Sequence, residues 1–126
     1  MHDSGKREQF STGAVRDTAD GKPRLVLISP FALRRRGEWL RLGAVKYAPR
    51  NWELGMGFSR VVDSLERHVQ AFKAGETDED HLAAVMCNAM FLIHYQTMIE
   101  RGALPAELND MPDYAPAPGV ISFTTE

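Results

Sequence analysis

A chain of 126 residues supports one hydrophobic core but not two. Its charged fraction of 25% and hydrophobic fraction of 44% are ordinary for a globular protein, and its net charge of -2 does not indicate a nucleic-acid polymer or a membrane surface as a partner. The single cysteine, Cys87, excludes an intrachain disulfide, and its position in an apolar run predicts a buried core residue.

The small net charge conceals a basic half and an acidic half. Residues 1–60 carry twelve Lys or Arg against six Asp or Glu, whereas residues 61–126 carry three against eleven. The two halves can attract each other within one domain. They also suit a ligand that is both polyanionic and metal-bound.

The chain divides into a main domain with two short ends. Residues 1–12 are polar and lack the apolar region of a signal peptide, so we expect a flexible N-terminus and a cytoplasmic protein. Residues 13–114 form a single predicted helical domain, and residues 115–126 form a proline-containing, irregular tail.

The first part of this domain predicts a loop followed by a helix. The apolar run Leu25–Ile28 is too short to distinguish a strand from an extended segment laid across helices. Ser29 can cap a helix that starts at Pro30, because proline fits the first helical position. The helix should reach about Tyr47, since Pro49 stops it.

Two further helices follow. Ser59 can cap a helix that runs to about Ala74, with apolar positions on one face at helical spacing. Thr77 and Asp80 have the spacing of a capping box, which predicts a third helix that ends at about Arg101. A short turn of helix near residues 105–109 is also expected.

The predicted fold class is therefore all-α, a small helical bundle with an extended N-terminal segment. The third helix contains the longest apolar run, Leu82–Ile93, which includes Asn88 and is too short to span a bilayer. Two other helices leave part of such a helix uncovered, so oligomerisation, as a homodimer or homotetramer, is expected to complete the bundle.

One side of the third helix carries candidate functional groups. At 100° per residue, Asp80, His81, Ala84 and Asn88 share one arc, with a small residue in its middle. These side chains can face one cavity. Alternatively, Asp80 only caps the helix and Asn88 only satisfies a neighbouring backbone group.

A second set of candidates surrounds the start of this helix. Glu76, Asp78, Glu79 and Asp80 place four carboxylates within five positions, which suits a solvated helix start and also a Mg²⁺ or Mn²⁺ site. His68 lies at the edge of the apolar face of the second helix, where a histidine is usually a partly buried structural residue. A functional role for His68 is favoured if its side chain points toward Asp80 or His81.

The basic half contains a loop over residues 46–53 that combines cations, aromatic rings and a carboxylate. Lys46 and Arg50 can bind phosphate, and Trp52 can stack on a base or anchor the loop to the core. Lys22 and Arg24 can add phosphate contacts. Arg34, Arg35 and Arg36 read instead as a solvated face, since consecutive helical residues point in different directions.

Several motifs then occur in an order that resembles the dATP/dGTP diphosphohydrolases common in phage genomes. They span about residues 12–114, and the segments are Thr12–Asp17, Gly21–Arg24, Leu27–Pro30, Gly43–Tyr47, Arg50–Glu53, Arg67–His68, Glu79–Ala84 and Asn88–Ala89. The resemblance implies kinship with the MazG-like all-α pyrophosphatases, which hold magnesium with ExxE and ExxD motifs. This sequence departs from that pattern, because Glu38, Glu66 and Glu79 are followed three residues later by Arg41, Val69 and Leu82.

The resemblance implies metal-dependent hydrolysis of dATP or dGTP to monophosphate and pyrophosphate, which adjusts the nucleotide pool. If the protein is phage-encoded, it would act in the host cell cytoplasm. The expected metal ligands for Mg²⁺ or Mn²⁺ are Glu53, Glu79 and Asp80, and the expected catalytic groups are His68, His81 and Asp80. The expected substrate contacts are Lys22, Arg24, Lys46, Arg50, Asn51, Trp52 and Asn88.

An alternative is a binding protein that sequesters a nucleotide without cleaving it, which the missing acidic pairs favour. Both hypotheses require acidic and imidazole groups from separate helices to gather opposite the Lys46–Arg50 turn. Covalent catalysis is disfavoured, because the chain lacks a GxSxG motif and its cysteine has no evident histidine partner pattern.

Overall fold

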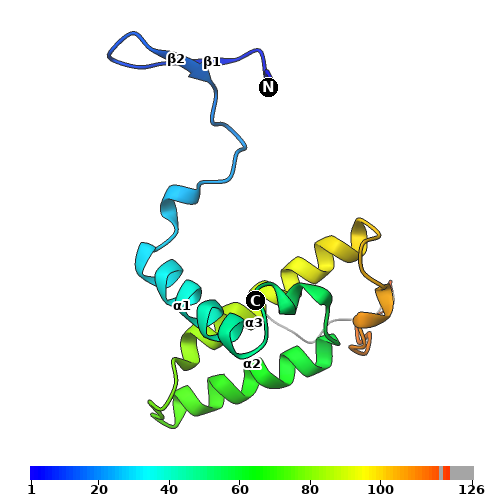
Figure 1. Ribbon diagram of the computed structural model, residues 1–126. Helices are drawn as coiled ribbons and strands as arrows, with labels where there is room; N and C mark the ends of the chain where they lie inside the picture. Colours follow the sequence, from blue (N-terminus) through cyan, green and yellow to red (C-terminus); the bar gives the residue numbers. More distant parts are fainter. Residues whose placement is uncertain (117, 120–126) are drawn as a thin grey trace.

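The computed structural model describes residues 1–116, 118 and 119, and three helices dominate it (Figure 1). Their bounds are α1 Pro30–Lys46, α2 Phe58–Lys73 and α3 His81–Glu100. The smaller elements are β1 Arg7–Gln9, β2 Val15–Asp17 and the 3-10 turns η1 Leu25–Leu27, η2 Asn51–Leu54 and η3 Ala106–Leu108. The mainly helical fold confirms the predicted class.

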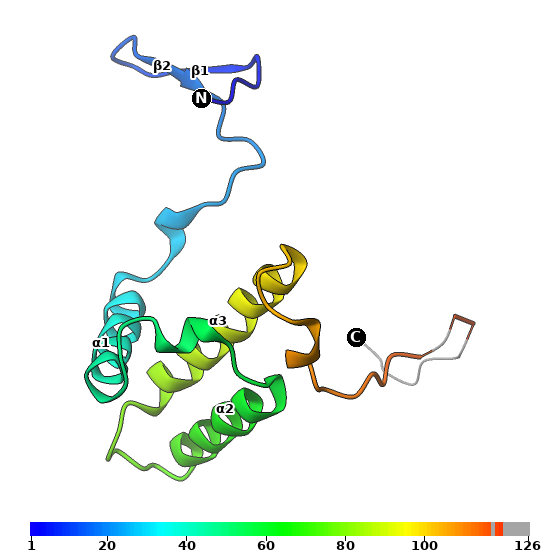
Figure 2. The same cartoon turned by 45° about the vertical axis from the view of Figure 1, so that its right-hand side comes forward.

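Helix α3 is the centre of the bundle and packs against both α1 and α2 (Figures 1 and 2). It supplies most of the fully buried residues, including Ala83, Ala84 and Cys87, whose small side chains let the neighbouring helices approach. The largest buried side chain, Tyr95, packs with Phe58 and Val61. Partly buried residues surround this cluster, namely Trp52, Met56, Phe91, Leu92, Ile99, Leu104 and Leu108.

The predicted start of α1 is confirmed. The Ser29 hydroxyl accepts a hydrogen bond from the Ala32 N–H at 3.2 Å, and Pro30 occupies the first helical position. None of the residues of α1 is fully buried, although the helix covers one side of α3. Much of α1 is therefore accessible on its outer side.

The predicted cap of α2 was wrong. The cap position is Gly57, and Ser59 lies inside the first turn. The carboxylate of Asp110 accepts hydrogen bonds from the Ser59 N–H at 2.8 Å and the Ser59 hydroxyl at 2.6 Å. A residue 51 positions away thus satisfies this helix start, which spacing along the sequence does not reveal.

The predicted capping box of α3 was also wrong. Asp80, rather than Thr77, is the cap, and its carboxylate accepts from the Ala83 N–H at 3.2 Å. Asp80 caps the helix in place of Thr77 because its carboxylate can accept from the Ala83 N–H, which has no partner within the helix. The same carboxylate also pairs with Arg35. The predicted end at Arg101 and the stop at Gly102 are confirmed, with Gly102 at φ +76°.

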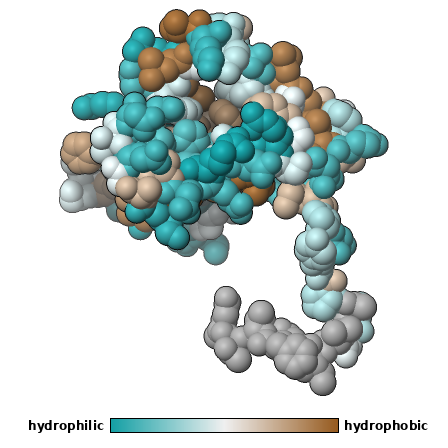
Figure 3. All heavy atoms as spheres, turned by 90° about the horizontal axis from the view of Figure 1, so that it is seen from below, coloured by the Kyte–Doolittle hydropathy of each residue, from teal (hydrophilic) through white to brown (hydrophobic). Residues whose placement is uncertain are grey.

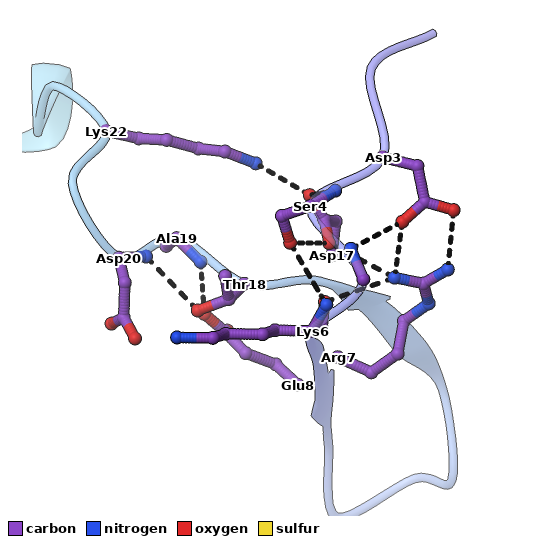
Figure 4. A network of polar contacts seen from close by, with 11 residues as sticks. Asp3, Ser4, Lys6, Arg7, Glu8, Asp17, Thr18, Ala19, Asp20 and Lys22 are labelled. Atoms are coloured by element: carbon purple, nitrogen blue, oxygen red, sulfur yellow. Dashed lines mark hydrogen bonds and ion pairs between the residues drawn. The ribbon is translucent and has the colours of Figure 1, made fainter.

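The N-terminus contains a β-hairpin, where we had expected a flexible segment up to residue 12. Strands β1 and β2 pair antiparallel with Arg7 opposite Asp17. The turn closes with a hydrogen bond from the Gly13 N–H to the Phe10 carbonyl, and Gly13 adopts φ +89°. Polar contacts centred on Asp17 hold the hairpin together, with Ser4, Arg7 and Lys22 as partners (Figure 4).

The hairpin and the segment after it project from the helical bundle (Figures 1 and 2). Residues 25–27 form the 3-10 turn η1, so neither of the predicted alternatives, a strand or an extended segment across the helices, is correct. Its side chains are exposed: Leu25 by 72%, Val26 by 81% and Leu27 by 71%. The short helical turn predicted near 105–109 is confirmed as η3. Part of the predicted irregular tail, residues 117 and 120–126, lies outside the described residues.

Among the described residues, α3 is the one helix long and apolar enough to cross a membrane, with a mean hydropathy of 1.4. The core helix of a soluble protein passes the same test, and α3 packs between two helices and contains the buried polar residues His81 and Asn88. Only 28% of its apolar window is buried, so α3 is a central helix with an open side.

Candidate functional site

Two neighbouring cavities lie along the C-terminal half of α1. The first has a volume of about 680 Å³, and the second about 390 Å³, both within the usual range of about 300–1,000 Å³ for small-molecule sites. Trp39, Gly43 and Tyr47 line both cavities. These three residues therefore form a wall that the two cavities share.

The first cavity, here called the aromatic cavity, is lined mainly by apolar and aromatic groups. Its aromatic residues are Trp39, Tyr47, Trp52 and Phe91. Its polar and charged residues are Arg41, Arg50, Asn51 and Glu53. This combination of flat rings with a few polar groups is typical of sites that bind an aromatic heterocycle.

Trp52 is held rigidly in this cavity. Its ring stacks on Phe91 with a centroid distance of 4.7 Å and an interplanar angle of 20°, and the ring of His94 meets its edge at 4.8 Å. The buried Tyr95 hydroxyl donates a hydrogen bond to the Trp52 carbonyl. The core therefore fixes both the backbone and the ring of Trp52.

The turn before Trp52 has an unusual backbone. Arg50 has φ +62°, which makes it the one non-glycine residue with positive φ in the part of the chain that the structure describes. This conformation costs about 1–2 kcal/mol relative to a right-handed one. It turns the chain into η2 and leaves the Arg50 guanidinium 2.6 Å from the carboxylate of Glu53. Strain of this kind often accompanies ligand-binding turns.

The second cavity, here called the charged cavity, mixes cations with carboxylates. The cations are Arg35 and Lys46, and the carboxylates are Glu38, Asp78, Glu79 and Asp80. Arg35 binds Asp80 through two hydrogen bonds of 2.9 and 2.6 Å, which lowers the pKa of the Asp80 carboxyl below its usual 3.8. This pair connects α1 to the start of α3 at the edge of the cavity.

His68 and His81 meet directly beside this cavity. Their Nδ1 atoms are 2.9 Å apart, and His81 Nε2 is 2.9 Å from the carboxylate of Asp78. Because a carboxylate only accepts, we assign the His81 proton to Nε2, which leaves Nδ1 to accept from the His68 Nδ1–H. This assignment leaves His68 Nε2 with a lone pair.

The environment of His68 favours its neutral form. Partial burial is the largest cause that lowers its pKa below 6.5, and nearby Glu79 opposes this shift. The edge of the His68 ring lies against Trp39, with centroids 5.5 Å apart. Since Trp39 lines both cavities, the imidazole chain is one side chain away from each of them.

The structure brings some of the predicted site residues together and separates others. His68 and His81 touch, and Lys46, Glu79 and Asp80 line the charged cavity. Arg50, Asn51, Trp52 and Glu53 line the aromatic cavity, so Glu53 is not among the carboxylates at the start of α3. Asn88 lines neither cavity and donates to the Ser64 hydroxyl at 3.3 Å. Lys22 and Arg24 lie on the N-terminal segment, away from both cavities.

Sequence reasoning missed three residues of this region. Arg35 was interpreted as a solvated residue and Trp39 was not among the candidates, yet Trp39 lines both cavities and Arg35 pairs with Asp80. Asp78 was not singled out from its acidic neighbours. The spacing Asp78-x-x-His81 offered a signal for that pair, because side chains three positions apart can meet at a helix start.

A divalent cation would find its ligands among the four carboxylates of the charged cavity. Their carboxylate oxygens have the chemistry that Mg²⁺ and Mn²⁺ prefer. However, Glu38, Asp78 and Asp80 are each bound to another side chain, respectively Arg41, His81 and Arg35. Among the described residues, there is no group of three or more potential ligands arranged to hold a metal ion. The donors fit chemically, but one chain alone does not arrange them as a metal site.

The fold and the two cavities define a helical bundle in which an aromatic cavity adjoins a charged one, a combination that suits a nucleotide. A family model described as dATP/dGTP diphosphohydrolase, N-terminal, matches residues 12–102, and the chain belongs to this family. The matched segment includes both cavities and part of the β-hairpin. The family description indicates an activity on a deoxynucleoside triphosphate. Neither the curated proteins nor the solved structures contain a match to the chain.

Proposed function

We propose that this protein hydrolyses purine deoxynucleoside triphosphates to the monophosphate and pyrophosphate, in the cytoplasm of the cell that makes it. The observation that carries the proposal is the shared wall of Trp39, Gly43 and Tyr47 between an aromatic and a charged cavity, in a chain of this family. A nucleotide has the same two-part character. The role would be to adjust the deoxynucleotide pool.

The base belongs in the aromatic cavity. Trp52 offers a ring whose position is fixed by Phe91 and Tyr95, so little conformational entropy is lost when a base stacks on it. Asn51 and Glu53 are the polar groups that can contact base edges there. A purine fits this role because its larger surface gains more from stacking.

The triphosphate belongs in the charged cavity. Lys46 is the cation best placed to meet it, because the lysine lies at the end of α1 next to Tyr47, which lines both cavities. Arg35 adds a guanidinium, although phosphate must then compete with Asp80 for it. Phosphate binding and the α1–α3 ion pair are therefore coupled.

His68 is the proposed general base, and it would act through one intervening water, because it lies behind Trp39 and lines neither cavity. Water attacks the α-phosphorus, the bond between the α-phosphorus and its bridging oxygen breaks, and pyrophosphate leaves. The water proton passes to His68 Nε2, and the resulting imidazolium donates from Nδ1 to His81, which in turn donates to Asp78. Asp78 thus stabilises the positive charge through His81.

The substrate we propose is the complex of the triphosphate with Mg²⁺ or Mn²⁺. Glu79 is the carboxylate of the charged cavity that makes no ion pair among the described residues, so it is the proposed protein ligand to that cation. Asp80 joins it only where phosphate takes Arg35 away. Glu53 lies in the aromatic cavity and pairs with Arg50, so it is not a ligand to the cation in this proposal.

The second candidate is a protein that binds the nucleotide without cleaving it. The ion pairs of Asp80 with Arg35 and of Glu53 with Arg50 favour it, because both carboxylates are already neutralised by a cation. In this case, the two cavities hold the ligand, and the histidine pair is structural.

One assay distinguishes the two candidates. The purified protein is incubated with each deoxynucleoside and ribonucleoside triphosphate and Mg²⁺ or Mn²⁺, and products are resolved by ion-exchange chromatography and ³¹P NMR. Monophosphate and pyrophosphate formed from dATP or dGTP, and abolished by a chelator, support hydrolysis. Tight binding with the nucleotide recovered intact supports the second candidate. No turnover and no binding of any triphosphate would refute both.

Two variants locate the activity. Lys46→Ala should raise KM for the triphosphate about tenfold or more, because a phosphate contact of this kind is worth about 1.4 kcal/mol or more. The matched control is Lys73→Ala, which removes an exposed lysine at the end of α2 that lines neither cavity. If the two substitutions change KM equally, the charged cavity is not the triphosphate site.

A further inference from the structure

The N-terminal segment presents an apolar surface that stays exposed in the part of the chain that the structure describes. Leu25, Val26 and Leu27 are 71–81% exposed, and Ile28 and Phe31 are 49% and 75% exposed. Consecutive large apolar residues rarely stay in water on a monomer, since each exposed side chain forgoes about 1.5–3 kcal/mol of burial. We refer to residues 22–31 as the arm.

The central helix has a complementary apolar stripe that is partly exposed, with Met86 and Ala89 half-buried. Leu82, Met86, Ala89 and Ile93 follow one another at spacings of four, three and four residues, so they lie along one side of α3. This side is opposite the face that carries the buried Ala84 and Asn88. Leu82 remains 42% exposed and Ile93 65% exposed, although the helix is the core of the bundle. We refer to these four residues as the α3 stripe.

The charges around the two surfaces are also complementary. Between Gly21 and Arg36, the chain has five cations and no carboxylate: Lys22, Arg24, Arg34, Arg35 and Arg36. The α3 stripe begins directly after Glu76, Asp78, Glu79 and Asp80. An arm with basic flanks therefore matches a stripe with an acidic end.

We propose that the arm of one protein molecule docks on the α3 stripe of a second copy, with Lys22 and Arg24 directed toward the acidic start of the second copy's α3. The arm would then cover the bare side of the central helix that this chain's own α1 and α2 leave open. The polar contacts of Arg7 with Asp3 and Asp17 hold the hairpin at the far end of the arm (Figure 4). On docking, Lys22 would exchange its 3.7 Å contact with Asp17 for the acidic start of the second copy's α3.

This docking gives the two arm cations a place in the proposed function, on which this part of the inference rests. Arg24 forms no ion pair within the described residues, and neither Arg24 nor Lys22 lines a cavity of its own chain. Docked on a second copy, both reach the edge of its charged cavity, where they balance Asp78 and Glu79 and meet the triphosphate. The cavity is then a composite of two copies.

Figure 3 shows that apolar surface remains accessible on the bundle, where brown areas adjoin a teal polar strip. A membrane is a poorer occupant than a second copy, because the acidic residues at the start of α3 would meet anionic lipid headgroups. Its own chain is a poorer occupant as well, because the arm points away from the bundle (Figures 1 and 2).

Sedimentation velocity tests the docking without any assay of activity. Wild type should sediment as a homodimer or homotetramer, whereas Val26→Asp combined with Leu27→Asp should weaken association by about tenfold or more. Tyr114→Asp is the matched control, because Tyr114 is an 87% exposed side chain in the tail. Circular dichroism shows whether the helices remain. A monomeric wild type, or an arm variant that associates as wild type does, overturns the proposal.

Cross-linking tests which surfaces meet. Leu27→Cys and Leu82→Cys are placed in separate chains, mixed and treated with a short bismaleimide. Cys87 should stay silent, because it is fully buried and burial raises the pKa of its thiol to about 11. A product that joins the two variants is expected, whereas Tyr114→Cys with Leu82→Cys should give none. If the double variant in one chain cross-links only within the monomer, the arm folds back on its own bundle, and the proposal fails.

Complementation tests the composite cavity. The variant Lys22→Ala/Arg24→Ala and the variant His68→Ala should each lose most activity. In a random 1:1 mixture of the two, half of the dimers contain one copy of each variant, and each such dimer has one intact site of two. The mixture should therefore recover about a quarter of the wild-type rate. No recovery in mixtures that cross-link normally would restrict the arm to a structural role and overturn the composite cavity. Inactive wild type that still cross-links would refute the proposed function but leave the docking in place.

Discussion

Replacing Gly55 with alanine should be the most damaging of the glycine-to-alanine changes in this protein. Gly55 has φ +104° and ψ 138°, a conformation that residues with a side chain rarely adopt. A Cβ atom there would lie 2.9 Å from Leu108 Cδ1 and 3.4 Å from Leu104 Cδ2. Gly55 also ends the η2 turn, so the substitution acts on the segment that carries Trp52.

The magnitude follows from two separate costs. The backbone strain amounts to about 1–2 kcal/mol, and overpacking against Leu108 adds about 1–2 kcal/mol, since the clashing methyl is the flexible end of a side chain. The free energy of unfolding should therefore decrease by about 2–4 kcal/mol, which corresponds to a melting temperature lower by about 10 °C for a chain of this size.

Two other glycines provide matched controls. Gly75→Ala introduces backbone strain but no steric clash, because Gly75 has φ +78° and open space around it. It should lower the free energy of unfolding by about 1 kcal/mol. Gly37→Ala has neither, because Gly37 lies in α1 with open space, and it should stabilise by about 0.5–1 kcal/mol. Urea unfolding followed by circular dichroism, at one protein concentration, gives all three values. The reasoning is refuted if Gly55→Ala costs no more than Gly75→Ala.

Three further predictions concern single interactions. Tyr95→Phe should lower the free energy of unfolding by about 1 kcal/mol and make Trp52 fluorescence more accessible to quenchers, because the Trp52 carbonyl loses one of its two donors and keeps only the Gly55 N–H. Ser29→Ala should cost about 1 kcal/mol by removing the cap of α1, measurable by thermal unfolding. The third is a loss of stability as the pH falls from 7 to 5: unfolded His68 takes up its proton near pH 6.5, whereas folded His68 does so only at lower pH. His68→Gln should flatten this profile in urea titrations, while His2→Gln should not.

The helices were predictable because their signals are local. Ser29 and Pro30 mark the start of α1 through contacts within three residues, and Gly102 marks the end of α3 through its own φ angle. The contacts at the start of α2 and the formation of the β-hairpin were not predictable in the same way. Asp110 reaches Ser59 across 51 positions, and the pairing of β1 with β2 depends on side-chain contacts to Asp17 that have no periodic pattern.

In the candidate site as well, residues that are neighbours in the sequence were predictable, and residues brought together by helix packing were not. The loop of residues 50–53 was found as a cluster of neighbours, and the structure places it around one cavity. The distribution of Glu53 and Asp80 between two cavities was not predictable, because it depends on how α1 lies across α3. The role of Arg35 was missed for the same reason, since three consecutive arginines give no indication of which one faces the bundle.

The basic and acidic halves of the sequence make direct contact in the ion pair of Arg35 with Asp80. This pair connects the basic α1 to the acidic start of α3, and the same Asp80 carboxylate also caps α3 through the Ala83 N–H. A phosphate group that takes Arg35 releases one of the links between the two helices and leaves the cap in place. Ligand binding at the charged cavity therefore acts on the packing of α1 against α3, and an additional pair of cations at that edge would compensate for the lost link. In the proposed docking, the arm of a second copy would supply such a pair in Lys22 and Arg24.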